Sequence, residues 1–246
     1  MDVLSIAAVS GMRSRMESLD MLANNLANTG AAGFKADREQ YNTYMDAESW
    51  GVHSNSVLPV VETKWTDFSQ GTITPTGNPA NIALVGDGFV AVTGPNGPLY
   101  TRNGNLKIAS DGTLQTQEGY PLIRKDNKRP IKVDSTKAFE ITPEGIVRQD
   151  GQDVAQMTLA RFDNPQKLTK IGNSYFQPAD SVANAAKPAL RLEVQQGRLE
   201  VSNVSAPEAA VRLVNILRQF ETMQKALTLA GEMNRRSVEE VAKVTG

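Results

Sequence analysis

The sequence contains no cysteine and only one histidine, His53, in 246 residues. Without cysteine there are no disulfides, no thiolate nucleophile, no iron–sulfur cluster and no thiolate zinc site. One histidine leaves no multi-histidine metal site and no spare histidine beside a serine–histidine–aspartate arrangement. We therefore predict that the protein is not an enzyme, with no catalytic residue, no cofactor-binding residue, no metal site and no cofactor.

Blocks of like charge and long apolar runs are also lacking. The 26 basic and 27 acidic residues give a formal net charge of −1 and are spread along the chain, which predicts no nucleic-acid partner. The apolar run Ile6-Ala7-Ala8-Val9 is too short for the core of a signal peptide. No segment approaches the ~20 apolar residues of a membrane span, so we predict no direct membrane insertion.

Two features of the sequence could indicate a phosphate-binding loop or a catalytic carboxylate pair, but each has a better structural explanation. Gly86-Asp87-Gly88 resembles the start of a phosphate-binding loop but is followed by neither a third glycine nor a Lys-Ser/Thr pair. A tight turn between strands explains it better. Several carboxylates near turns could in principle pair as in glycosidases, but turns favour aspartate for backbone reasons. These carboxylates are Asp87, Asp111, Glu118, Asp150 and Asp153.

The first part of the chain, up to about Asn28, has the periodicity of a helix. Its apolar residues recur at three- and four-residue spacing and line one helix face. They are Val9, Met12, Met16, Leu19, Ala23 and Leu26.

The period changes between about Gly71 and Ala189, where short apolar runs alternate with turn dipeptides such as Asn96-Gly97 and Asp111-Gly112. Residues that tolerate positive φ at such intervals indicate hairpins. We predict an antiparallel β domain; the pattern does not decide between a sandwich and a barrel.

The last part begins with a capping box, Ser205 as N-cap and Glu208 three residues later. A long helix is predicted from there to the C-terminus. Its main apolar face consists of Leu213, Ile216, Phe220, Met223, Leu227 and Ala230. Val214 and Leu217 widen this face, which suggests burial against more than one neighbour.

These segments predict an α+β fold: a central antiparallel β domain flanked by long N- and C-terminal helices that pair as a coiled coil. The predicted division is 1–33 for the first helix, 34–80 for an elbow or linker, 81–204 for the β domain and 205–246 for the last helix. The helices are too long to pack entirely on a small β domain, which favours packing between molecules. The alternative is that both helices wrap a core within one molecule.

Three blocks of the sequence resemble the family of flagellar rod and hook proteins. The first runs from Ala23-Asn24-Asn25-Leu26-Ala27-Asn28 to Gly33-Phe34-Lys35, the second from Thr76-Gly77-Asn78-Pro79 to Leu99-Tyr100-Thr101-Arg102-Asn103-Gly104, and the third is Gly197-Arg198-Leu199-Glu200-Val201-Ser202-Asn203-Val204. Asn81, Gly30 and Ala31 depart from the usual family residues. The run Arg218-Gln219-Phe220-Glu221 and the modest length resemble the proximal-rod members first and the distal-rod members second.

The resemblance implies a structural axial subunit of the bacterial flagellar basal body that assembles with copies of itself and with other flagellar rod proteins. It also implies a location in the periplasmic rod, reached through the flagellar type III export apparatus without a cleaved signal peptide. We expect the subunit interface to contain Val9, Met12, Met16, Leu19, Leu26, Phe34, Lys35, Leu213, Ile216, Phe220, Met223 and Leu227. Two alternatives remain open, an oligomeric surface-binding β module and, less favoured, a hydrolase.

Overall fold

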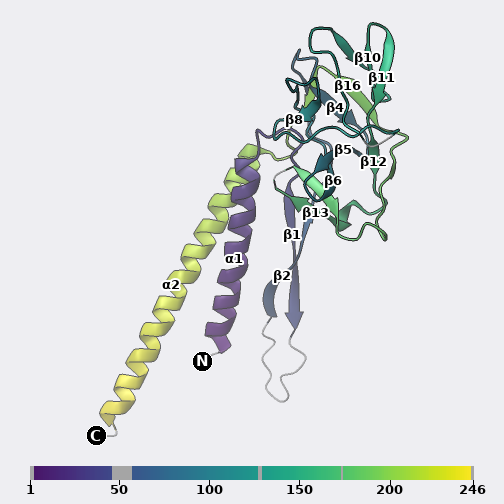
Figure 1. The fold of residues 1–246 in the computed structure, drawn as a ribbon. Helices are drawn as coiled ribbons and strands as arrows, with labels where there is room; N and C mark the ends of the chain where they lie inside the picture. The colour runs from purple at the N-terminus through teal and green to yellow at the C-terminus, as the bar shows by residue number, and fades with distance from the viewer. Residues whose placement is uncertain (1–2, 46–56, 127–128, 173, 245–246) are drawn as a thin grey trace. The chain divides into compact units, whose positions relative to one another are not determined.

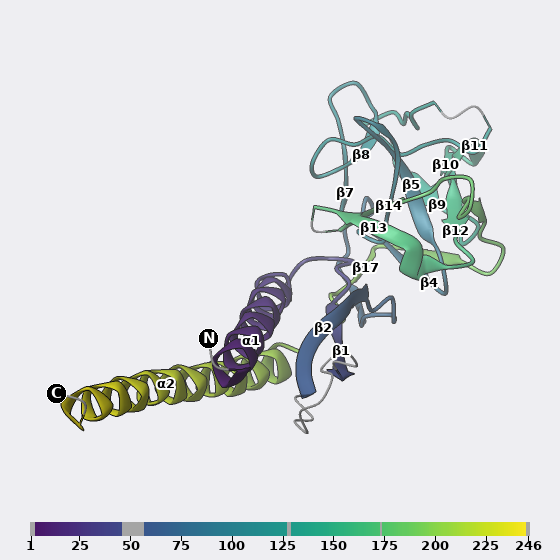
Figure 2. The same ribbon diagram turned by 90° about the horizontal axis from the view of Figure 1, so that it is seen from below.

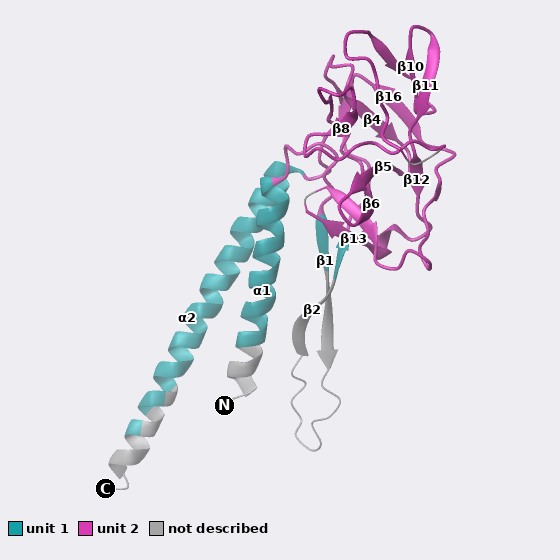
Figure 3. Ribbon diagram, viewed as in Figure 1, with its two compact units in different colours: residues 1–27, 37–65, 205–246 teal, residues 28–36, 66–204 magenta. Residues whose placement is uncertain are grey.

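A computed structural model of the chain describes residues 3–45, 57–126, 129–172 and 174–244. The chain divides into two compact units, shown in different colours in Figure 3. Unit 1 comprises residues 1–27, 37–65 and 205–246. Unit 2 comprises residues 28–36 and 66–204.

Unit 2 is built from antiparallel strands (Figure 1). Its largest sheet has six strands in the order β13 (Leu168–Ile171), β14 (Tyr175–Pro178), β6 (Gly97–Thr101), β5 (Phe89–Gly94), β12 (Leu159–Arg161) and β15 (Lys187–Pro188). A three-stranded sheet contains β11 (Gln152–Gln156), β10 (Ile146–Gln149) and β9 (Phe139–Ile141). Three strand pairs complete the unit: β16 (Glu193–Gln196) with β4 (Ile82–Val85), β17 (Arg198–Glu200) with β3 (Ile73–Pro75), and β7 (Leu106–Ile108) with β8 (Leu114–Thr116). A short 3-10 helix, η1 (Pro165–Lys167), precedes β13.

The six-stranded sheet has a hydrophobic core on each face. Successive side chains of a strand point to opposite faces. On β5, Val90 and Val92 join the larger core, whereas Phe89 and Ala91 join the smaller, aromatic one. A strand buried on both faces reads as a continuous apolar run, which is why this segment shows no polar alternation.

Unit 1 contains two helices and a two-stranded sheet. Helix α1 (Val3–Ala27) and helix α2 (Ala206–Val244) lie side by side and antiparallel in both views (Figure 1, Figure 2). Strands β1 (Asp37–Met45) and β2 (Val57–Thr66) pair with each other. Helix α1 ends at Ala27, and α2 begins directly after Ser205, the residue at which the capping box predicts the helix start.

The face that α1 turns inward is not its apolar stripe. Its buried residues are mostly small or polar: Gly11, Ser14, Ser18, Met21, Leu22 and Asn25. The hydroxyl of Ser18 donates to Glu39 Oε2 on β1 at 2.7 Å. The side chain of Asn25 both donates to and accepts from the backbone of Asp37, at 2.8 and 3.0 Å. On the outward side, Val9 is 59% exposed and Met16 is 55% exposed.

The predicted fold class is therefore wrong. The chain has one helix at each end and is otherwise mostly β-sheet, and no coiled-coil pairing of the terminal helices is shown among the described residues. A coiled coil requires apolar knobs from both helices in the shared seam. Here the buried Ser18 of α1 contacts Glu39 on β1, and Gly11, beside Met223 of α2, has no side chain to insert; in the described part of α2 only Ala209 is buried.

The segment predicted as an elbow, residues 34–80, contains β1, β2 and β3. The sequence pattern predicts β structure only from about Gly71 onward, so it covers β3 but not β1 or β2. The four-part division of the chain stays a prediction.

Candidate functional site

Three charged side chains meet inside unit 2, where the chain enters it after α1 and leaves it before α2. Lys35 Nζ lies 2.6 Å from Glu200 Oε1, and Arg102 Nε lies 3.0 Å from Glu200 Oε2. The side chains of Lys35 and Glu200 are 0% exposed and that of Arg102 is 3% exposed. We call Lys35, Arg102 and Glu200 the ion cluster.

Backbone carbonyls satisfy the two cations of the ion cluster. Lys35 Nζ donates to the carbonyl of Ser69 at 2.7 Å. Arg102 Nη2 donates to the carbonyls of Leu84 and Gly86, at 3.1 and 2.8 Å. A buried charge is tolerated only when its partners are all in place, so this geometry ties five separate segments to one another through Glu200.

The carboxylate of Glu200 is the centre of the ion cluster. Besides the two cations it accepts a hydrogen bond from the backbone N–H of Gly71 at 2.9 Å. Burial lowers the pKa of the Lys35 ammonium, and the adjacent Glu200 carboxylate opposes that shift. Glu200 thus holds a cation that would otherwise be costly to bury.

Glycines allow the backbone to approach the ion cluster closely. The N–H of Gly33 donates to the carbonyl of Glu200 at 2.7 Å, and Gly33 has a φ of +65°. A Cβ on Gly33 would lie 2.3 Å from the carbonyl carbon of Arg102. A Cβ on Gly71 would lie 1.9 Å from the carbonyl oxygen of Val201. Only glycine fits at these two positions without a backbone shift.

Gly33→Ala is expected to lower the free energy of unfolding by about 3–4 kcal/mol, the sum of a left-handed φ and a backbone clash. Gly77→Ala is the matched control, because Gly77 has a φ of +69° but nothing within 4 Å of the added Cβ. This control is expected to cost about 1–2 kcal/mol. Urea unfolding followed by circular dichroism measures both; equal losses would contradict the proposed close approach.

Asn203 lies in the outgoing segment, by which the chain leaves unit 2 before α2, and its side chain contacts residues near the ion cluster. Its Oδ1 accepts from the N–H of Ala36 at 2.8 Å, and its Nδ2 donates to the carbonyl of Asp67 at 2.8 Å and to Ser69 Oγ at 3.1 Å. One amide side chain therefore bridges the incoming segment, the outgoing segment and the start of the β domain.

The three sequence blocks that carry the family resemblance meet at the ion cluster. Lys35 comes from the first block, Arg102 from the second and Glu200 from the third. Sequence reasoning assigned Lys35 to a subunit interface and gave Arg102 and Glu200 no role. The only sequence feature that marks Arg102 and Glu200 is the charge that each carries within its block. Glu200 is 165 positions from Lys35 and 98 positions from Arg102, so no sequence spacing links it to either residue.

The elbow residues predicted for the interface lie inside unit 2. Phe34 and Lys35 are 0% exposed. Lys170 Nζ lies 4.1 Å from the centre of the Phe34 ring and donates to the carbonyl of Lys35 at 2.9 Å. Within this subunit, neither side chain presents a surface to another molecule.

The helical interface residues are all at least partly exposed. On α1, Val9 and Met16 are exposed, whereas Met12, Leu19 and Leu26 are half-buried. The α2 residues form one half-buried row: Leu213, Ile216, Phe220, Met223 and Leu227. Beside this row, Val214 is 47% exposed and Leu217 is 42% exposed. The α2 row is thus half-buried throughout, whereas in the α1 stripe Val9 and Met16 are exposed and the other three residues are half-buried.

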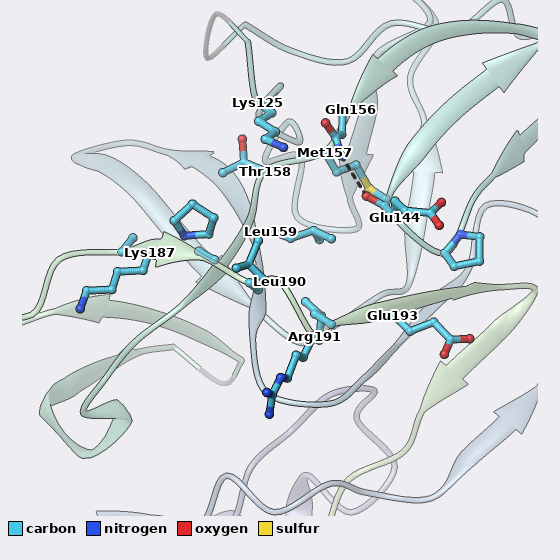
Figure 4. Close-up of a pocket in the computed structure, with 16 residues that line it drawn as sticks. Lys125, Glu144, Gln156, Met157, Thr158, Leu159, Lys187, Leu190, Arg191 and Glu193 are labelled. Atoms are coloured by element: carbon cyan, nitrogen blue, oxygen red, sulfur yellow. Dashed lines mark hydrogen bonds between the residues drawn. The ribbon is translucent and has the colours of Figure 1, made fainter.

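A groove of about 750 Å³ in unit 2 lies beside β12 and β15. It is lined by 16 residues, among them the apolar Met157, Leu159 and Leu190 (Figure 4). Figure 4 shows the side chains of Lys187 and Glu193 pointing away from each other. Figure 4 marks one hydrogen bond between lining residues, from Gln156 Nε2 to the carbonyl of Glu144 at 3.2 Å.

His53 lies outside the described residues. In the part of the chain that the structure describes, no helix is both long and apolar enough to cross a membrane.

Comparison with known proteins identifies relatives along the whole chain. The flagellar hook protein FlgE/F/G D1 domain matches residues 83–149, and the C-terminal domain of flagellar basal-body rod FlgEFG proteins matches residues 195–239. The flagellar basal-body rod protein FlgF of Caulobacter vibrioides is 28% identical, over 99% of this chain and 100% of its own length. The flagellar basal-body rod proteins FlgG of Agrobacterium fabrum and Bacillus subtilis are 29% and 28% identical, over 95% and 92% of this chain and 97% and 94% of their own lengths. With both domain models matched in order and relatives that match over most of their length, the chain is similar to the flagellar hook and basal-body rod proteins.

Proposed function

We propose that the protein is a structural subunit of the flagellar basal-body rod and not an enzyme. The relatives that match nearly the whole chain carry the name of basal-body rod proteins. The structural observation that supports assembly is the outward apolar stripe of α1, with Val9 and Met16 more than half exposed. Exposed apolar residues in a row on one helix face mark a surface that another molecule covers.

Relatives named FlgF and FlgG both match, and we propose a proximal-rod subunit, with a distal-rod subunit as the alternative. The proximal rod is the first candidate because the run Arg218-Gln219-Phe220-Glu221 and the modest length of the chain resemble its members. Assembly with other flagellar basal-body proteins is proposed from the similarity to these proteins. Delivery by the flagellar type III export apparatus is part of the proposal and rests on the resemblance.

For the interface we propose the helical residues and not the buried elbow. The α1 stripe (Val9, Met12, Met16, Leu19, Leu26) would contact a neighbouring subunit directly. The half-buried α2 row (Leu213, Ile216, Phe220, Met223, Leu227) and the adjacent Val214 and Leu217 would extend this surface. The full burial of Phe34 and Lys35 gives those two residues an internal role instead.

Deletion of the gene tests the proposed function. Without a rod subunit, isolated basal bodies are expected to end at a truncated rod, and the cells are expected to be non-motile; a plasmid copy restores both. Electron microscopy of basal bodies and a soft-agar motility assay provide the measurements. Basal bodies with complete rods in the deletion strain would contradict the proposal.

A further inference from the structure

We propose that Asn96 is a site of spontaneous covalent modification, at which the chain converts its own asparagine to an isoaspartyl or aspartyl residue. The site lies in the turn that joins β5 to β6, within the Asn96-Gly97 dipeptide that marks this hairpin in the sequence. The proposal does not rest on the function proposed above, because it concerns the chemistry of the isolated chain.

The reaction needs only the side chain of Asn96, the next backbone nitrogen and water. The nitrogen of Gly97 bonds to the side-chain carbonyl carbon of Asn96, and the amide nitrogen leaves as ammonia with the proton that Gly97 loses. Water then opens the resulting cyclic imide. When the bond from the Gly97 nitrogen to the side-chain carbon breaks, the product is aspartate. When the bond to the main-chain carbonyl carbon breaks, the product is isoaspartate.

The turn at Asn96 leaves room for this attack. Asn96 is exposed. Gly97 has a φ of +122°, and a Cβ at this position would meet nothing within 4 Å. Because glycine has no side chain, its nitrogen is accessible and its backbone tolerates the rotation that brings the reacting atoms together. Gly94 and Gly97 form the last pair of the hairpin, where opening is least costly.

The second Asn-Gly pair of the chain, Asn103-Gly104, is held in place. Asn103 Oδ1 accepts a hydrogen bond from the N–H of Asn105 at 3.0 Å. Gly104 is buried, and its carbonyl accepts from the N–H of Ile82 at 2.9 Å. A Cβ on Gly104 would lie 1.8 Å from the carbonyl oxygen of Ile82. Attack at Asn103 therefore requires local unfolding, unlike attack in the open turn.

Isoaspartate alters the turn that sets the register of the hairpin. It adds one carbon to the main chain between the two strands and a carboxylate at the tip, and loop length fixes the strand register. Val92 on β5 pairs with Leu99 on β6, and both are buried in the larger core. Modified chains, separated from unmodified chains by anion exchange, are therefore expected to unfold at a lower urea concentration.

Incubation of the purified chain at mildly alkaline pH, followed by trypsin digestion and mass spectrometry, tests the proposal. Trypsin cleaves after Arg102 and so separates the two Asn-Gly pairs into different peptides. In the folded chain, Asn96 is expected to form isoaspartate at least about tenfold faster than Asn103, because only Asn103 has to wait for local opening. Equal rates in the folded chain, or no isoaspartate at Asn96, would overturn the proposal.

Two controls assign the difference to the fold and to the residue. In concentrated urea neither Asn-Gly pair is protected, so the two rates are expected to become alike; a difference that persists there would show that the fold is not its cause. Asn96→Gln keeps a side-chain amide but lengthens the side chain by one methylene, which disfavours ring closure. This variant is expected to lose the isoaspartyl signal at position 96 and to leave the rate at Asn103 unchanged.

Discussion

Glu200→Gln lowers the free energy of unfolding of the β domain by about 3–5 kcal/mol, which makes it the most damaging isosteric change that we expect in the chain. Glutamine keeps the shape of the side chain but removes the charge that compensates Lys35 and Arg102. Two buried cations then face each other without an anion between them. Urea denaturation followed by far-ultraviolet circular dichroism measures the loss.

Asp153→Asn is the matched control for this experiment. Asp153 pairs with Arg148 at 2.5 Å, but both side chains are about half exposed, at 55% and 42%. Exposed pairs contribute at most about 1 kcal/mol, so the same carboxylate-to-amide change is expected to cost no more than that. A loss in the Glu200 variant as small as in the Asp153 variant would show that the ion cluster does not hold unit 2 together.

The second large effect is expected on assembly. Met16→Asp places a carboxylate in the middle of the outward stripe of α1, where Met16 is already 55% exposed in the single subunit. Stability of the isolated chain is expected to stay within about 0.5 kcal/mol of wild type, as for most surface substitutions. A carboxylate buried in an apolar contact costs several kcal/mol, so association is expected to weaken by at least about a hundredfold, roughly 3 kcal/mol.

Arg13→Gln controls for the change in charge. It also makes the net charge one unit more negative, but Arg13 lies off the stripe and is 84% exposed in its side chain. Rod formation is scored from basal bodies isolated from cells that carry each variant. Loss of rods with Met16→Asp and not with Arg13→Gln supports the stripe; normal rods with both variants would rule it out.

The strands of unit 2 were predictable where local chemistry decides the structure. The Asn96-Gly97 turn supplies a positive φ of 122° and joins β5 to β6, which pair antiparallel as the hairpin signal predicts. Strand β1, by contrast, has the sequence DREQYNTYM and lacks apolar alternation. Strand β17 is short, with the sequence RLE, and pairs with β3 from the other end of unit 2. The pairing of β17 is thus fixed by a partner that is distant in sequence, which a local pattern does not reveal.

For the helices, sequence periodicity predicts where the apolar residues gather but not which face of the helix is buried. The stripe of α1 does lie on one face, yet sequence alone does not reveal which face is covered within the subunit. Ser18 and Asn25 turn inward because Glu39 and the backbone of Asp37 satisfy them there. The ion cluster was unpredictable for the same reason: its charges become neighbours only after the β domain has folded.

Photo-crosslinking from position 16 in assembled basal bodies tests the central claim, that the outward stripe of α1 is a subunit interface. The native chain has no cysteine, so Met16→Cys provides one attachment point for a benzophenone maleimide. Irradiation of isolated basal bodies is expected to link this position to a rod subunit, while a probe attached to Arg13→Cys forms far fewer adducts. Equal yields at both positions, or adducts to no rod protein, would contradict the claim.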